Sequence, residues 1–197
     1  MTSRLVALCF DANDSLRLAR FWADALHWEI DDETLDEIGL VPTDDTRFRI
    51  LFLAVPEQKA GKNRIHLDLT STSIDDQKET VERLVELGAR HIDVGQGPDD
   101  EHVVLADPEG NEFCVIEPDN SFLADCGRFG SITCDGTREV GYFWSEALGW
   151  PLVWDCRRRR NPPGSRSRNP PAGSVVLFYS VAARFSSGTR PGRLLGR

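Results

Sequence analysis

Two segments in the middle of the chain constrain the fold most strongly. Residues 64–70 alternate apolar and polar side chains, as expected of a strand with one buried face. Residues 107–110 have the composition of a type I turn, with Asp first, Pro second and Gly fourth, and residues 112–117 then form a returning strand. A helical pattern and short apolar runs at 91–94 and 102–106 lie between them. The order predicts a βαβββ unit, which builds half of a curved sheet around a cleft.

The helix of this unit has clear ends. Ser73 is placed to cap it, and apolar residues follow at helical spacing up to Leu87. Gly88 can adopt the left-handed conformation that stops a helix. These signals predict a helix that begins after Ser73 and ends before Gly88.

Residues 4–56 show a similar pattern, and we expect them to form a second βαβββ unit. Residues 5–10 predict a strand, Asn13 or Asp14 caps a helix with apolar residues at helical spacing, and residues 28–30 predict a second strand. Residues 31–45 are acidic and rich in turn formers, and residues 48–55 predict a strand that Pro56 ends. Residues 1–118 therefore predict one complete domain made of units 4–56 and 64–117.

An internal repeat indicates the start of a second copy. Residues 21–30 and 143–152 share five identical positions in ten, in the pattern Phe-Trp-x-x-Ala-Leu-x-Trp. Residues 119–155 therefore predict the opening strand and helix of another domain. The two copies of the repeat carry four tryptophans, Trp22, Trp28, Trp144 and Trp150, which are expected to pack in cores.

The sequence changes character at Cys156. Residues 1–155 carry thirteen basic and thirty-two acidic residues, whereas residues 156–197 carry ten arginines and no acid. This Arg-, Pro- and Gly-rich composition predicts a disordered tail, in which only residues 174–182 favour a strand. Two origins remain open, a native tail or a shifted reading frame that truncates the second copy.

Composition limits the classes of function. There is no apolar run long enough to span a membrane and no secretory signal, so we expect a cytoplasmic protein. The five cysteines form no CxxC pair, which predicts neither a disulfide framework nor a zinc knuckle. The arginine run 157–160 lacks the surrounding pattern of a nucleic-acid-binding motif.

The motifs together resemble the vicinal oxygen chelate superfamily, which includes glyoxalase, bleomycin-resistance and dioxygenase proteins. The resemblance rests on residues 55–57, 62–69, 87–89 and 107–113 and on the Phe-Trp helix ends. Within the superfamily it is nearest to the glyoxalase-like domains often found in tandem in actinobacteria. It implies an α+β fold in which paired βαβββ units form a curved mixed sheet around a cleft.

The resemblance also implies where a metal would bind. Enzymes of the superfamily hold a divalent metal with His and Glu side chains on the first and last strands of the paired units. His66 stands at one such position, while Cys114 occupies the place of the expected Glu. Asp68 and Glu112 lie two residues away along their strands, too far for a bond near 2 Å without rearrangement. The full ligand set is absent, so we expect no catalytic metal.

The candidate cleft residues are Arg64, His66, Asp68, Glu112 and Cys114. His66 is a candidate metal ligand, general base or hydrogen-bond donor, or a scaffold residue bonded to its strand neighbours. Cys114 is a candidate nucleophile next to His66, although a buried strand cysteine more often serves as a small apolar side chain.

Two functions remain open. One is a glyoxalase- or lyase-like enzyme that accommodates a small metabolite with a degenerate metal site. The other is a metal-free module of the bleomycin-resistance type that binds or sequesters a drug or metabolite. We expect a small-molecule ligand, allow for a homodimer, and expect neither a membrane nor a nucleic acid as partner.

Overall fold

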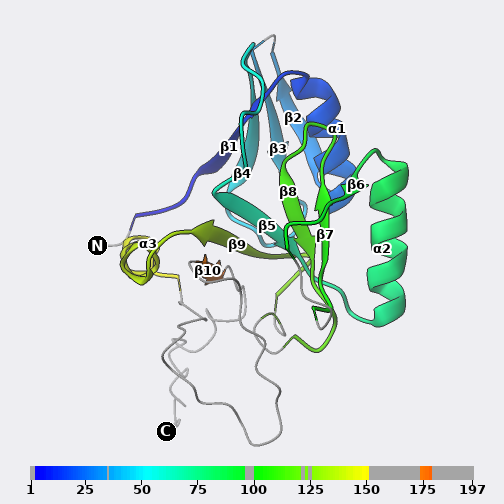
Figure 1. Cartoon of the computed structure of the whole chain (residues 1–197). Helices are drawn as coiled ribbons and strands as arrows, with labels where there is room; N and C mark the ends of the chain where they lie inside the picture. Colours follow the sequence, from blue (N-terminus) through cyan, green and yellow to red (C-terminus); the bar gives the residue numbers. More distant parts are fainter. Residues whose placement is uncertain are drawn as a thin grey trace, which may run out of the picture.

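The computed structural model contains two β-sheets with helices packed against them (Figure 1). It describes residues 3–34, 36–95, 100–120, 123, 126–150 and the strand 174–178. The α+β class and the mixed sheets of paired βαβββ units, predicted from the sequence, are confirmed. Each of the two complete units keeps its own sheet.

Unit one forms a four-stranded sheet in the order β1-β4-β3-β2. Its first and last strands pair in parallel, and the other neighbours are antiparallel. The elements are β1 (Ala7–Ala12), α1 (Ser15–Leu26), β2 (Glu29–Glu33), β3 (Glu37–Val41) and β4 (Arg49–Ala54).

Strand β3 corrects the prediction of a turn-rich segment over residues 31–45. Ile38 and Leu40 alternate with Gly39 and are buried, so the strand has one core-facing side despite the acids around it. It pairs with β2 on one side and β4 on the other. The acidic flanks concealed this short apolar alternation.

Unit two repeats the arrangement. Its elements are β5 (Ile65–Leu69), α2 (Ile74–Glu86), β6 (Arg90–His91), β7 (Val103–Ala106) and β8 (Glu112–Val115). The Ser73 side chain accepts a hydrogen bond from the Asp76 amide, as the capping pattern predicts. Gly88 has a φ of +111°, which confirms the left-handed stop after the helix.

The third unit continues the sheet of unit two. Its elements are β9 (Phe129–Asp135), α3 (Arg138–Leu148) and β10 (Ser174–Phe178), and the six-stranded sheet has the order β10-β9-β5-β8-β7-β6. The antiparallel pairing of β5 with β9 needs Gly130, because a Cβ there would lie 2.8 Å from Thr70 Cγ2. Strand β10 falls within the predicted strand 174–182, and the other residues of the predicted tail lie outside the described residues.

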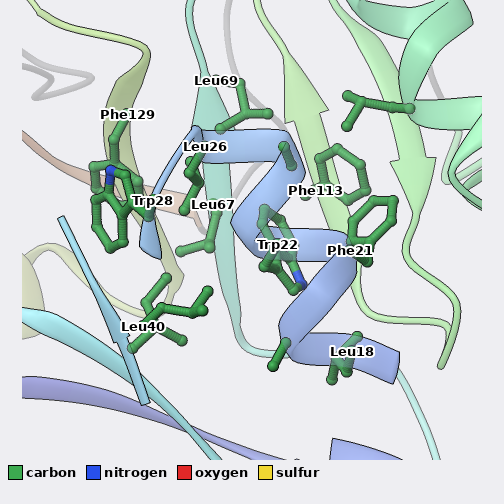
Figure 2. Packing of buried hydrophobic residues seen from close by; sticks show 14 of the residues in the cluster. Leu18, Phe21, Trp22, Leu26, Trp28, Leu40, Leu67, Leu69, Phe113 and Phe129 are labelled. Carbon is green, nitrogen blue, oxygen red and sulfur yellow. The ribbon is translucent and has the colours of Figure 1, made fainter. Parts of the chain in front are cut away.

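The main core lies where α1 meets unit two. Figure 2 shows Phe21 and Trp22 of α1 directed toward Phe113 of β8. The Trp22 and Phe113 ring centroids are 5.0 Å apart in an edge-on arrangement, and both side chains are buried. Burial of such aromatic surfaces stabilises the contact between the units by several kcal/mol, at about 25 cal/mol per Å².

The helix of the third unit differs from its counterpart in unit one. Phe143 and Trp144 are 61% and 41% exposed, whereas the matching Phe21 and Trp22 are buried. The prediction that Trp144 packs in a core was therefore wrong. In unit one the covering residue is Phe113 of the following unit, and no matching strand covers α3 in the described part of the chain.

The described helices are all too short or too polar to cross a membrane.

Candidate functional site

A groove of about 470 Å³ runs beside β1 and is the candidate ligand site. One wall is formed by residues 8–11 of β1 together with Asn13. The other wall is formed by the segment between β4 and β5 and by the start of β5. Glu109 and Asn111 of the turn between β7 and β8 close it. The groove thus lies between the sheets of the two units.

The two sequence segments that define the fold meet at this groove. The side-chain amide of Asn63 donates a hydrogen bond to Asn111 Oδ1 at 2.8 Å. The backbone amide of Asn63 donates to Glu112 Oε2 at 3.2 Å, and Lys59 Nζ forms an ion pair with the same carboxylate at 3.1 Å. The far wall is therefore held to β8 by specific polar contacts.

Glu112 is committed to this structural role. Its partial burial acts to raise the pKa of the carboxyl group, but hydrogen bonds from backbone amides, including that of Asn63, and from Lys59 lower the pKa overall. A charged carboxylate that already accepts these bonds is poorly placed to act as a general base.

Arg64 gives the groove its available positive charge. The side chain is exposed and lines the groove at the start of β5. Lys59, the other cation of the lining, is engaged by Glu112. Within the described residues Arg64 forms no ion pair, so its guanidinium can bind an anionic or polar group in the groove.

The remaining candidates lie on the central strands, on the face opposite the core. Asp68 is buried and accepts hydrogen bonds from Ser131 Oγ at 2.5 Å and Thr133 Oγ1 at 2.6 Å, both on β9. The register places Cys114 of β8 and Ser131 of β9 on either side of Asp68, and Thr133 beside His66. Asp68 is thus the centre of a polar network that links three strands.

Burial controls the ionisation of this network. It raises the pKa of Asp68 although the hydroxyl donors and the nearby His66 favour the carboxylate. Burial, with the adjacent Asp68 charge as the next cause, raises the pKa of Cys114 well above its ordinary value of 9.0. The thiol is therefore held protonated, and Cys114 is not an activated nucleophile.

The side chains of His66, Asp68 and Cys114 are not arranged as the ligands of a catalytic metal. Throughout the described ranges there is no group of three or more His, Cys, Asp or Glu side chains arranged to hold one. The oxygen of Asp68 that faces β9 already accepts two hydroxyl hydrogen bonds. A tetrahedral site would need at least three deprotonated protein ligands.

The structure therefore separates the five predicted cleft residues. Arg64 lines the groove, and Glu112 supports its wall through Lys59 and Asn63. The groove lining does not include the other three, His66, Asp68 and Cys114. They lie on β5 and β8, on the face of these strands opposite the core.

Sequence reasoning missed three polar residues that shape the groove. Asn63 and Asn111 stand inside the two motifs, but they were treated there only as fold markers. Their amide side chains, which both donate and accept hydrogen bonds, were the available signal. Lys59 lies in an irregular segment and gave no signal.

The model of the glyoxalase-like domain family matches residues 7–116, more than half of the chain. The chain belongs to the glyoxalase-like domain family. The match covers both complete units and the groove between them. No protein of curated function matches the sequence.

Solved structures are similar at low sequence identity. A glyoxalase-related enzyme from Fulvimarina pelagi shares 14% identity, with a TM-score of 0.50 over 64% of this chain and 95% of that one. An enzyme of the glyoxalase/bleomycin resistance protein/dioxygenase family from Burkholderia phytofirmans PsJN shares 17%, with a TM-score of 0.48 over 57% and 97%. The fosfomycin resistance protein FosX from Mesorhizobium loti shares 14%, with a TM-score of 0.47 over 61% and 96%. At these identities the likeness concerns the fold alone.

Proposed function

We propose that this glyoxalase-like protein binds a small metabolite or drug in the groove beside β1 without a metal. The observation that carries the proposal is the groove itself, with Arg64 and the side-chain amides of Asn63 and Asn111 in its lining. Small-molecule sites are usually concave and combine apolar surface with polar groups. In this groove Leu8, Phe10 and Ile65 contribute apolar surface to a lining in which polar and charged residues predominate.

The carboxylates of Asp11, Glu57 and Glu109 line the groove together with Arg64, so the preferred ligand is expected to place an anionic group at Arg64 alone. Arg64 supplies a fork of N–H donors, and Leu8 and Phe10 of β1 give the groove an apolar side. A small organic acid or a phosphate monoester presents an anion for the guanidinium and a carbon skeleton for β1. Charge-assisted hydrogen bonds of this kind contribute about 1.5–3 kcal/mol.

The protonation of Cys114 and the positions of Cys114 and Asp68 favour a binding role over a catalytic one. The protonated Cys114 thiol and the carboxylate of Asp68 are tied to one another and to β9, away from the groove. Neither group reaches a ligand held by Arg64, because neither lines the groove. A sequestering role, of the kind found in bleomycin-resistance proteins, therefore agrees best with this arrangement.

A thermal-shift screen tests the proposal. The panel contains small carboxylates, phosphate monoesters and the hemithioacetal of methylglyoxal and glutathione. At least one anionic compound is expected to raise the melting temperature of the wild type and to lose about tenfold or more in affinity on Arg64→Gln. Arg47→Gln is the matched control, because Arg47 does not line the groove. Turnover of the hemithioacetal would contradict a binding role.

A cytoplasmic location is part of the same proposal. The four described cysteines form no disulfide, which agrees with a reducing compartment.

A further inference from the structure

The groove beside β1 carries charged groups of both signs. Its lining includes the cations Arg64 and Lys59 and the carboxylates of Asp11, Glu57 and Glu109. Asp11 belongs to the wall formed by β1, whereas Arg64 belongs to the other wall, at the start of β5. The charges that are not already paired within the protein decide what a ligand must carry.

Two of these five charged groups are engaged by the protein itself. The carboxylate oxygens of Glu109 accept hydrogen bonds from backbone amides at the start of α1, from Asn13 at 2.8 Å and from Asp14 at 2.6 Å. Lys59 Nζ pairs with the carboxylate of Glu112 at 3.1 Å. Because charge-assisted contacts already satisfy Glu109 and Lys59, neither group is the main attraction for a ligand.

Three charged groups remain available. Arg64, Asp11 and Glu57 are exposed, and no ion pair or side-chain hydrogen bond engages their charged groups within the described residues. The side-chain amide of Asn13 donates to the backbone carbonyls of Val55 and Glu57, both at 2.9 Å. Since Asn13 follows Asp11 by two residues, both acidic residues lie close to Asn13, at the end of the groove where β1 ends.

These three charges favour a ligand with two charges of its own. An anion alone is attracted by Arg64 and repelled by two carboxylates, whereas a cation alone is attracted by the carboxylates and repelled by Arg64. A ligand with an anionic group and an ammonium group gains both attractions. Leu8 and Phe10 of β1 also line the groove and offer apolar surface to a short carbon skeleton.

We propose that the ligand of this groove is a small zwitterion, such as an amino acid or an aminoalkyl phosphate. Its anionic group binds Arg64, and its ammonium group binds Asp11 and Glu57. An ammonium group has three N–H donors, enough to serve both carboxylates. The inference rests on the proposed function, because it concerns the same groove, and it adds Asp11 and Glu57 as the residues that determine specificity.

Calorimetric titration of the full chain with matched series of small molecules tests the proposal. Each series contains a zwitterion, the acid that lacks the amine and the amine that lacks the acid. The series are ε-aminocaproate, caproate and hexylamine; γ-aminobutyrate, butyrate and butylamine; and phosphoethanolamine, ethyl phosphate and ethylamine. In at least one series the wild type is expected to bind the zwitterion about tenfold or more tightly than the acid or the amine.

Substitutions in the groove assign the two charges of the ligand. Asp11→Asn and Glu57→Gln are each expected to reduce the preference for the zwitterion over the acid, and the double variant to abolish it without weakening the acid. Arg64→Gln is expected to abolish the preference for the zwitterion over the amine. Glu79→Gln is the matched control, because Glu79 is exposed on α2 and does not line the groove. It is expected to leave all affinities unchanged.

Failure of this inference is distinguishable from failure of the proposed function. Acids that bind through Arg64 as tightly as their zwitterions would overturn the inference and leave ligand binding in the groove standing. Amines that bind as tightly as the zwitterions, or a preference for the zwitterion that survives in the double variant, would also overturn it. Absence of binding by every compound of these series and of the thermal-shift panel would overturn both proposals.

Discussion

Trp22 on α1 donates a hydrogen bond from its indole Nε1 to Oδ2 of Asp107, at 3.1 Å and across 85 residues of sequence. The same carboxylate accepts bonds from the backbone amides of Glu109 and Asn111 and from the Asn111 side chain. Asp107 is fully buried, and its pKa is raised by burial despite these donors. The turn that marks the family in the sequence is therefore also the joint between the two units.

Trp22→Phe is expected to destabilise the fold by about 1 kcal/mol beyond the loss of ring area, because the buried carboxylate of Asp107 loses one of its donors and keeps the Asn111 side chain on the same oxygen. Trp28→Phe is the matched control, since the Trp28 indole donates to the less buried Asp44 at 3.3 Å. Urea unfolding of Trp22→Phe, Asp107→Asn and the double variant gives the coupling energy directly. A coupling near zero would show that the bond contributes nothing.

Glu109 extends the joint to the start of α1. Its carboxylate accepts hydrogen bonds from the backbone amides of Asn13 at 2.8 Å and Asp14 at 2.6 Å. An anion at a helix N-terminus also interacts favourably with the helix dipole. Glu109→Gln is expected to lower the free energy of unfolding by about 1 kcal/mol. The same change at the exposed Glu79 of α2 should have a much smaller effect, and equal losses would argue against the cap.

The raised pKa of Asp68 predicts that the free energy of unfolding depends on pH. Its native pKa is raised, so the native state binds the proton more tightly than the unfolded state. The tighter binding of the proton stabilises the native state. This stabilisation is fully present below the pKa of Asp68 in the unfolded state and is lost as pH rises through its pKa in the native state. Relative to Asp68→Asn, the wild type should lose about 1.4 kcal/mol per pH unit within that window. Urea titrations across acidic pH measure the difference, and parallel curves for the two proteins would refute it.

The cysteines should differ in reactivity. Cys9 is exposed, whereas burial and Asp68 raise the pKa of the Cys114 thiol. Iodoacetamide at mildly alkaline pH should therefore label Cys9 well before Cys114, because the thiolate is the reactive form. Mass spectrometry of the digested protein, with Cys9→Ser as control, follows both sites. Rapid labelling of Cys114 in the folded protein would restore it as a candidate nucleophile.

The sequence predicted local elements well and contacts between units poorly. Capping at Asp14 and Ser73 and the turn at Asp107 depend on neighbouring residues, and the structure confirms them. The contacts of Glu109 with the start of α1 join residues more than ninety positions apart, which no local pattern reveals. The exposure of Trp144 likewise depends on the strand that covers α3, and not on the helix.

The same distinction explains the candidate site. Alternation along β5 correctly placed His66 and Asp68 on one face, away from the core residues Leu67 and Leu69. It could not show that β9 would supply hydroxyl donors to Asp68. The groove beside β1 depends on the path of the segment after β4, which has no periodic pattern.

The central claim, ligand binding in the groove without a metal, is tested most directly by calorimetric titration of chelator-treated protein with the best compound of the panel, alongside elemental analysis. We predict an unchanged dissociation constant after chelation, no stoichiometric divalent metal, and about tenfold weaker binding in Arg64→Gln. A stoichiometric metal that is lost on His66→Ala, together with ligand binding that chelation abolishes, would contradict the account.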